Sequence, residues 1–303
     1  MSDDFSGAER HIDRIYRAAV EPEHWPIFLD GLRKELRLAS LSLVFRHPGV
    51  GDRGLITSVG ADEDYGDLYR SPVYKLNPWL PWGSEMKIGR ALLADSVLPQ
   101  SELVRTEFYN DWLRPQGLAH LFTAFLCKLG PQGLLSELGG LREKAAGPLC
   151  DADLHPVRLL IPHLQRALVI HSRVEEAELR AGAAAEALDR IVGGVILLDE
   201  RGAPILTNRA ADRILAANDG LTLDREGCSA ANPKQTGELR KLLSEAAATG
   251  AGKGIQAGGV MRLARPSRRR PLEVVVAPVR RGASPMFACD AATTVIFVTD
   301  PDA

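Results

Sequence analysis

The sequence predicts an α+β protein of two domains that are joined by a long helix. The chain has 303 residues, and a domain commonly holds roughly 100–200, so the length accommodates two domains. Segments with helical spacing and short β-type runs occur in both halves, which is typical of helices packed on antiparallel sheets. One long helical pattern lies between the halves. We therefore expect domains at 1–150 and 193–303 and a linking helix at 151–192.

The first domain is expected to place helices around an antiparallel sheet. Two helices are predicted within residues 8–38, because Pro22 lacks an N–H group and interrupts the helical spacing. Two prolines within 77–82 predict an aromatic loop there. The remaining elements, in chain order, are strands at 41–45 and 54–59, helices at 64–76 and 101–113, and strands at 122–129 and 133–142.

The linking segment carries mostly apolar residues at alternating spacings of four and three. This spacing is typical of a coiled-coil seam, in which two helices pack along one stripe, and it predicts a homodimer. A helix that packs on its own subunit is the alternative. The predicted interface residues are Leu160, Leu164, Ala167, His171, Val174, Ala181, Ala185 and Leu188.

The second domain is predicted to have the element order β-β-α-α-β-β-β. The expected strands and helices are, in turn, 194–198, 204–208, 209–217, 233–249, 259–265, 272–278 and 293–299. Asn208 ends the second strand, where its side chain can cap the next helix, and the small Ala210 and Ala211 let that helix lie close to the sheet. This stretch and this order resemble a PAS domain, which implies an antiparallel five-stranded sheet. The first domain is similar to GAF and PAS domains.

Short motifs run along nearly the whole chain. They are Asn77-Pro78-Trp79, Ser101-Glu102-Leu103, Phe108-Tyr109-x-x-Trp112-x-Arg114-Pro115-Gln116-Gly117-Leu118, Pro162-His163-Leu164-x-Arg166-Ala167, the Asn208 junction, Arg265-Pro266-Ser267, Pro271-Leu272 and Val298-x-Asp300-Pro301. With them the chain resembles the sensory region of bacterial LuxR-type transcriptional regulators. In such regulators a helix-turn-helix domain follows the last motif. No amphipathic helix pair follows it before Ala303, so we expect DNA binding only through a helix-turn-helix domain that is missing from these residues.

Aromatic residues are concentrated in the first domain, with eight of the 17 lying between positions 65 and 112. Such a cluster suits a pocket for a small, partly apolar ligand, although an ordinary core cluster is the alternative. The pattern from Tyr69 to Trp79 also resembles acyl-homoserine-lactone receptors, with Asn77 where those proteins have an acidic residue. The candidate ligand-binding residues are Tyr69, Tyr74, Trp79, Trp82, Phe108, Tyr109, Trp112 and His120.

The interior of the second domain is another candidate cavity, for which we favour a filled apolar core. Its expected lining is Ile196, Leu198, Leu206, Ile214, Leu215, Leu242, Met261, Val274, Val276 and Phe297. No histidine follows His171, which argues against histidine-ligated haem there, and no cofactor is identified. No metal site is predicted, because the four cysteines are widely spaced. The arginines between 262 and 281 are expected to form a solvated turn.

The composition excludes several classes of protein. The net charge is -2, so nothing global demands nucleic acid or an anionic membrane as a partner. The first residues are acidic and polar rather than a secretory signal, and no apolar run reaches the ~18 residues of a spanning helix. We expect a cytoplasmic protein that has no membrane partner.

These observations favour a sensor that binds an unidentified small molecule, dimerises and passes a conformational change through the linking helix to a transcription output. The chain contains no GxSxG, Walker A, GxGxxG or HExxH motif, so no catalytic residue is predicted. One alternative is an enzyme that uses the aromatic cleft, with Asp95, Glu102, Asp111 and His120 as acid–base candidates. A scaffold that dimerises without ligand is a third possibility.

Overall fold

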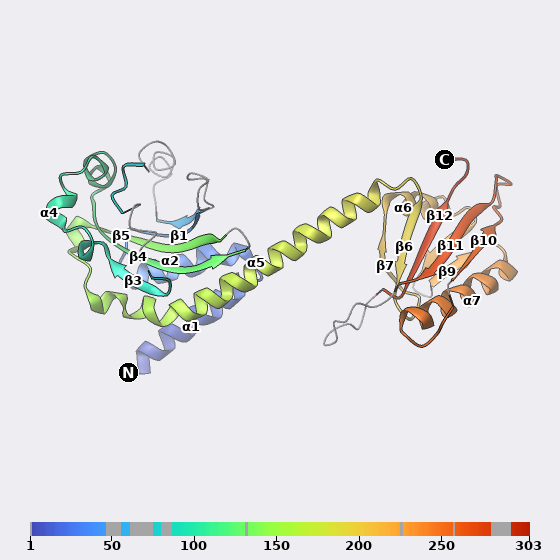
Figure 1. The fold of residues 1–303 in the computed structure, drawn as a ribbon, viewed down its shortest axis with the longest axis horizontal. Helices are drawn as coiled ribbons and strands as arrows, with labels where there is room; N and C mark the ends of the chain where they lie inside the picture. Colours follow the sequence, from blue (N-terminus) through green and yellow to red (C-terminus); the bar gives the residue numbers. More distant parts are fainter. Residues whose placement is uncertain are drawn as a thin grey trace. The chain divides into compact units, whose positions relative to one another are not determined.

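The computed structural model describes residues 2–46, 56–60, 75–79, 87–130, 133–224, 227–256, 258–279 and 292–303 (Figure 1). The chain divides into two compact units, Met1–Glu178 and Leu179–Ala303. The first unit therefore extends beyond the expected limit at residue 150, because the start of the long helix packs into its core. The predicted helix at 64–76 lies almost wholly outside the described residues.

The first unit is built on a five-stranded antiparallel sheet in the order β2-β1-β5-β4-β3. Its strands are β1 (Ser40–Arg46), β2 (Ile56–Val59), β3 (Arg90–Leu93), β4 (Leu118–Leu129) and β5 (Leu134–Glu143). Its helices are α1 (Ser2–Ala18), α2 (Trp25–Glu35), the short α4 (Gln100–Leu103) and the start of α5 (His155–Asp189). Short helical turns lie at Pro22–His24, Ala94–Ser96, Tyr109–Leu113, Arg114–Gln116, Lys144–Ala146 and Asp151–Leu154.

One face of this sheet carries the main core of the unit. Helices α1, α2 and α5 gather along this face (Figure 1), which we call the helix-covered face. Strand side chains alternate between the two faces, so Phe122, Ala124 and Leu126 of β4 point to the helices and are fully buried. Gly140 lies opposite Phe122 in the register, and a Cβ atom there would lie 2.3 Å from the Phe122 ring. Because position 140 has no side chain, the Phe122 ring can occupy this space.

The predicted single helix at 101–113 is wrong in detail. The chain forms α4, leaves the helical path after Leu103, and continues in a π-helical turn at Tyr109–Leu113. The hydroxyl of Thr106 accepts a hydrogen bond of 3.1 Å from the Tyr109 N–H group, so the side chain caps the second helical segment. A threonine inside a helical pattern thus starts a new turn here.

Helix α5 has two different environments along its length. Leu160, Leu164 and Ala167 are at most 1% exposed and pack within the core of the first unit. These three residues have no surface left for a partner, so their assignment to a dimer interface is wrong. His171 contacts the ring of Trp25 edge-on at 6.1 Å. From 175 to 187 every side chain is exposed.

The second unit repeats the strand order of the first. Its five-stranded antiparallel sheet runs β10-β11-β12-β6-β7, and in each unit the first and last strands of the sheet pair side by side. The strands are β6 (Gly194–Leu198), β7 (Pro204–Thr207), β10 (Gly259–Leu263), β11 (Leu272–Pro278) and β12 (Thr294–Thr299). Helices α6 (Arg209–Ala216) and α7 (Pro233–Gly250) precede β10. The predicted order of the sheet strands and the two helices is confirmed, with one further hairpin between α6 and α7.

The second core is filled by apolar side chains from the sheet, α6 and α7. Phe297 was expected to line it, but this residue is 41% exposed, whereas its neighbours Ile296 and Val298 are fully buried. Phe297 belongs to the outer face because side chains alternate along β12. The sequence reasoning also missed a two-stranded hairpin, β8 (Leu221–Asp224) with β9 (Gly227–Ala230).

No helix among the described residues combines the length and the apolar character that crossing a bilayer requires.

Candidate functional site

The second face of the first sheet, opposite the helix-covered face, carries a row of small polar residues. Ser58, Ser42, Gly139 and Thr123 follow one another across β2, β1, β5 and β4 as direct register partners. The hydroxyl oxygens of Ser42 and Ser58 lie 2.7 Å apart, and the Thr123 hydroxyl donates to the Glu137 carboxylate at 2.7 Å. A Cβ atom on Gly139 would meet no atom of a described residue within 4 Å. We call these four residues and Glu137 the polar floor.

An aromatic cluster packs against the same face. Leu121 and Leu141 contact this cluster. They are register partners and lie two residues along the strands from the pair Thr123 and Gly139. The Phe108 ring meets Trp79 edge-on at 5.9 Å and Trp112 in a tilted arrangement at 5.1 Å. Trp79, Phe108 and Tyr109 are buried, and Trp112 is half-buried. An apolar wall therefore adjoins a floor that carries fixed hydroxyl groups.

The structure brings four of the eight predicted ligand-binding residues together in this cluster: Trp79, Phe108, Tyr109 and Trp112. Tyr69, Tyr74 and Trp82 lie outside the described residues. His120 does not join the cluster. It is the register partner of Arg142, and it alternates with Leu121, so it points to the helix-covered face.

Two buried polar atoms near the cluster lack a hydrogen-bond partner among the described residues. They are the indole Nε1 of Trp79 and the amide oxygen of Gln100, which lies one helical turn before the cluster residue Leu103. Leaving a buried polar group unpaired costs about 1–3 kcal/mol, so native proteins pair almost all of them. Gln100 was missed from the sequence, because nothing in its neighbours marks a buried amide.

The acid–base candidates of the enzyme hypothesis do not converge. Glu102 and Asp111 are exposed, and Asp95 lies half-buried in the turn Ala94–Ser96. His120 points to the other face of the sheet. A hydrolytic or proton-transfer site needs such groups within hydrogen-bond reach of one reacting atom.

In the second unit, Asn208 joins the end of α5 to the sheet and to α6. Its side-chain oxygen accepts hydrogen bonds from the N–H groups of Val195 at 2.8 Å and Ala211 at 2.9 Å. Its side-chain nitrogen donates to the carbonyls of Leu188 at 2.8 Å and Gly193 at 3.0 Å. The predicted helix cap at Asn208 is confirmed, and the residue is only 2% exposed.

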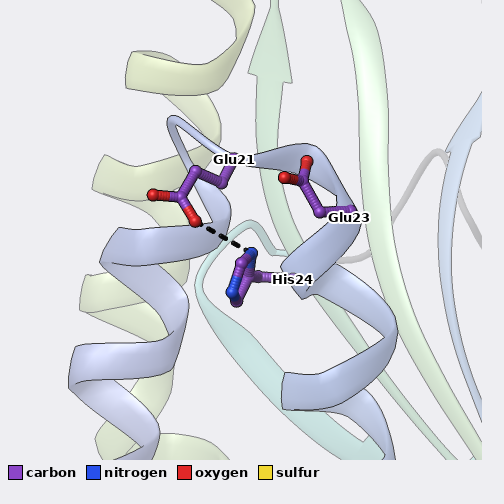
Figure 2. Close-up of side chains that lie close together, drawn as sticks. All are labelled: Glu21, Glu23 and His24. Atoms are coloured by element: carbon purple, nitrogen blue, oxygen red, sulfur yellow. Dashed lines mark ion pairs between the residues drawn. The ribbon is translucent and has the colours of Figure 1, made fainter.

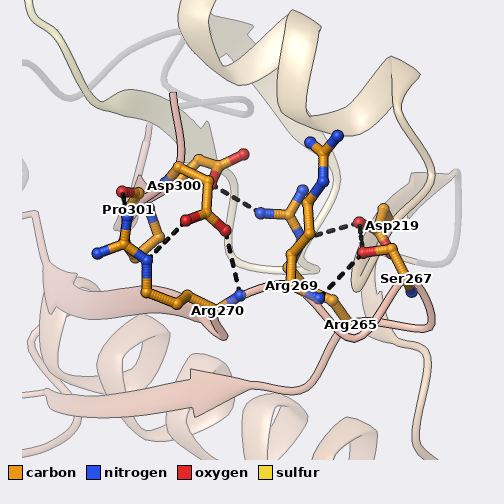
Figure 3. A network of polar contacts seen from close by, with 8 residues as sticks. Asp219, Arg265, Ser267, Arg269, Arg270, Asp300 and Pro301 are labelled. Atoms are coloured by element: carbon orange, nitrogen blue, oxygen red, sulfur yellow. Dashed lines mark hydrogen bonds and ion pairs between the residues drawn. The ribbon is translucent and has the colours of Figure 1, made fainter.

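Three arginines of the basic segment, Arg262, Arg265 and Arg270, form ion pairs (Figure 3). Arg268 and Arg269 are exposed, as expected for a solvated turn, and Arg280 and Arg281 lie outside the described residues. Arg265 has a side chain that is 3% exposed, and it lies between Asp219 at 2.8 Å and Asp300 at 2.7 Å. Ser267 donates to Asp219 through its hydroxyl and its backbone N–H, and these bonds, with Arg265, lower the pKa of Asp219 to about 2. Arg270 pairs with Asp302 at 2.6 Å. These contacts tie the segment after β12 to the body of the unit.

A carboxylate–histidine group lies at the turn between α1 and α2 (Figure 2). Oxygen and nitrogen atoms of Glu21, Glu23 and His24 lie within 4.8 Å of one another. The Glu21 carboxylate also accepts a hydrogen bond of 2.9 Å from Arg17, and this bond is the main reason its pKa is lowered. We assign the group to the ion pairs that hold this exposed turn.

The described cysteines are single thiols in separate surroundings, and Cys289 lies outside the described residues. Cys228 is buried in the second core, and desolvation raises the pKa of its thiol to about 12. Desolvation also raises the pKa of Cys127. Neither thiol is set up as a nucleophile, because the reactive form is the thiolate.

Comparison with known families and curated proteins gave no match. Solved structures match the first half of the chain. The N-acylhomoserine lactone dependent LuxR family transcription factor CepR2 from Burkholderia cenocepacia is 14% identical, covering 56% of this chain and 98% of that one, with a TM-score of 0.41. Escherichia coli SdiA is 21% identical, and the match covers 56% of this chain and 68% of the SdiA chain, with a TM-score of 0.41. A GAF domain/HD domain protein from Geobacter sulfurreducens is 15% identical, covering 54% and 94%, with a TM-score of 0.34.

Proposed function

We propose that this chain is the signal-sensing, dimerising input module of a cytoplasmic LuxR-type transcriptional regulator. The first unit binds a small molecule, and α5 carries the response. DNA is then bound by a helix-turn-helix domain outside residues 1–303. Both units have a five-stranded antiparallel sheet of one order, which is the type of sheet expected from the GAF and PAS resemblance.

The observation that carries the proposal is an apolar wall next to polar groups, two of which have no hydrogen-bond partner among the described residues. Ligand pockets are mostly apolar and contain a few fixed polar groups that orient the ligand. The wall is the aromatic cluster around Phe108, and the polar groups are the Trp79 N–H, the Gln100 carbonyl oxygen and the hydroxyls of the polar floor. The Trp79 N–H has no partner among the described residues.

The proposed ligand is therefore partly apolar and carries both a hydrogen-bond acceptor and a donor. Its apolar part would lie against Trp112, which is half-buried and tilted onto Phe108. Its acceptor would take the Trp79 N–H, and its donor would bond to Gln100. These two hydrogen bonds, which the protein alone does not form, would contribute to the free energy of binding.

The proposed response passes through α5. Val174, Ala181, Ala185 and Leu188 remain as the dimer seam once Leu160, Leu164 and Ala167, which are buried, and His171, which contacts Trp25, are removed from it. An exposed helix of this length is marginal alone in water, and pairing with a second copy would stabilise it. A ligand that favours one packing of the two copies over another shifts their populations.

The test is native mass spectrometry of the full chain purified without denaturation, combined with two matched variants. Trp79 and Trp25 are both buried and both have an unpaired Nε1, but Trp25 lies in the helix-covered core. We expect a retained small molecule in the wild type and in W25F, and its loss in W79F. Equal retention by both variants, or no bound molecule after incubation with cell extract, would contradict the proposal.

A further inference from the structure

A cleft of about 480 Å³ opens at the end of the first sheet where α2 leads into β1. Its lining includes Arg33, Arg37, Ser40, Gly60, Gln116 and Glu143. Leu118, which packs in the aromatic cluster, also lines the cleft, so the cleft and the cluster share this residue. Its volume lies within the range of roughly 300–1,000 Å³ that small-molecule sites occupy.

Arg33 forms a fixed wall of the cleft. Its guanidinium donates to the Asp30 carboxylate at 2.9 and 3.0 Å and to the carbonyl of Leu38 at 3.2 Å. Gly60 has φ of +73°, and a Cβ atom there would lie 2.2 Å from the Ala39 carbonyl oxygen and 2.8 Å from the Arg33 side chain. A glycine is therefore required for β2 to end against this wall. The N–H donors of Arg33 already bond to Asp30 and to the carbonyls of Leu38 and Ala39, so we do not assign Arg33 to the ligand.

Arg37 is in a backbone conformation that an arginine rarely adopts. It follows the end of α2 with φ of +51°. The N–H groups of Arg37 and Leu38 bond back to the carbonyls of Lys34 and Arg33 at 3.2 and 2.9 Å. This closing motif usually has glycine at the left-handed position, because a Cβ atom is strained there. A strained non-glycine residue at the edge of a cleft points to a role for its side chain.

Arg37 and Glu143 supply opposite charges that do not pair with each other. Both residues are exposed and line the same cleft. Among the residues that the structure describes, neither side chain is in an ion pair, although many other charged residues of the unit are. Ser40 and Gln116 add neutral hydrogen-bonding groups. A cleft lined by a cation and an anion that are not in ion pairs is complementary to a molecule that carries both a negative and a positive charge.

We propose that this cleft binds a small zwitterion of the α-amino-acid class. The Arg37 guanidinium binds the carboxylate of the ligand through paired N–H donors, and the Glu143 carboxylate binds its ammonium group. This site goes beyond the ligand proposed for the aromatic cluster and does not depend on it.

The test is a titration of the full chain with each of the twenty common L-amino acids, followed by ligand-observed NMR. The amino acid that binds is then compared with its N-acetyl derivative, which lacks the ammonium charge, and its amide, which lacks the carboxylate. We expect R37G to weaken binding of the amino acid at least tenfold, and E143Q to do the same, while each blocked derivative binds at least tenfold more weakly to the wild type.

The matched control is R268G. Arg268 is the other arginine with a left-handed backbone among the described residues, with φ of +62°, and it lies in the second unit. R37G and R268G remove the same charge and the same kind of strain, so both variants should fold and only R37G should lose binding. Failure of all twenty amino acids to bind, or unchanged binding by R37G, would overturn the proposal. W79F should leave amino-acid binding unchanged, which separates this site from the aromatic one.

Discussion

The side-chain nitrogen of Asn208 donates a hydrogen bond of 2.8 Å to the carbonyl oxygen of Leu188, near the end of α5. The last carbonyls of a helix have no partner within the helix, so this bond satisfies one of them from a side chain that is anchored in the second sheet. The other three bonds of Asn208 fix it to β6, to α6 and to Gly193. The end of α5 is thereby hydrogen-bonded to the sheet and helix of the second unit.

Replacing Asn208 with alanine should destabilise the second unit by about 3 kcal/mol, because it leaves the buried N–H groups of Val195 and Ala211 without their partner. Asn232 provides the control, since it caps α7 through one exposed bond of 2.9 Å to the Lys234 N–H. N232A should cost about 1 kcal/mol, as for an ordinary cap. Urea unfolding of both variants measures the difference, and equal losses would show that Asn208 is only a cap.

Stability should fall in acid through Asp219. Its pKa in the folded protein is about 2, below the ordinary 3.8, because Ser267 and Arg265 stabilise the carboxylate. A lowered folded pKa contributes stability that is fully present above pH 3.8 and is lost as the pH falls toward about 2. The free-energy difference between the wild type and D219N, measured by urea unfolding at a series of pH values, should therefore shrink across this window. A difference that stays constant would contradict the assignment.

Two adjacent glycines should respond oppositely to alanine. A Cβ atom on Gly140 would lie 2.3 Å from Phe122 and 2.9 Å from Leu38, so G140A should lose about 1–3 kcal/mol by overpacking. Gly139 belongs to the polar floor, and a Cβ atom there would meet no described atom within 4 Å. The G139A variant should therefore be as stable as the wild type or more stable by up to about 1 kcal/mol. Thermal unfolding of the two variants checks this. A large loss in G139A would show that the second face is closely packed.

The dimer seam should depend on one side of α5. Ala181 and Ala183 are both exposed, but they lie on opposite sides of the helix because two residues span about 200°. A181E should shift the protein from dimer to monomer in light scattering, and A183E should not. A wild type that is monomeric at high concentration, or equal behaviour of both variants, would exclude the seam.

Local signals predicted the second unit well. The cap at Asn208 acts over a few residues, so its position can be read directly from the chain. Two predicted spans, 194–198 and 272–278, match the observed strands at both ends. The hairpin of β8 and β9 was missed because its strands are short and only partly apolar.

The site of the first unit was less predictable, because it depends on which face of a strand each residue reaches. A bulge in β4 between Leu118 and His120 sets the alternation that turns His120 away from the aromatic cluster. The unpaired Gln100 and the cleft beside Arg37 arise from contacts between segments far apart in the sequence.

By itself, the sequence determined the class of fold, the long helix and the concentration of aromatic side chains, since periodicity and capping act within a few residues. Only the tertiary structure decided that Leu160, Leu164 and Ala167 face their own core, because an apolar stripe looks the same whether it meets its own sheet or a second copy. It also decided that Arg265 is buried between two aspartates rather than solvated. Partners for a stripe or a charge are chosen by long-range packing, which spacing along the chain does not encode.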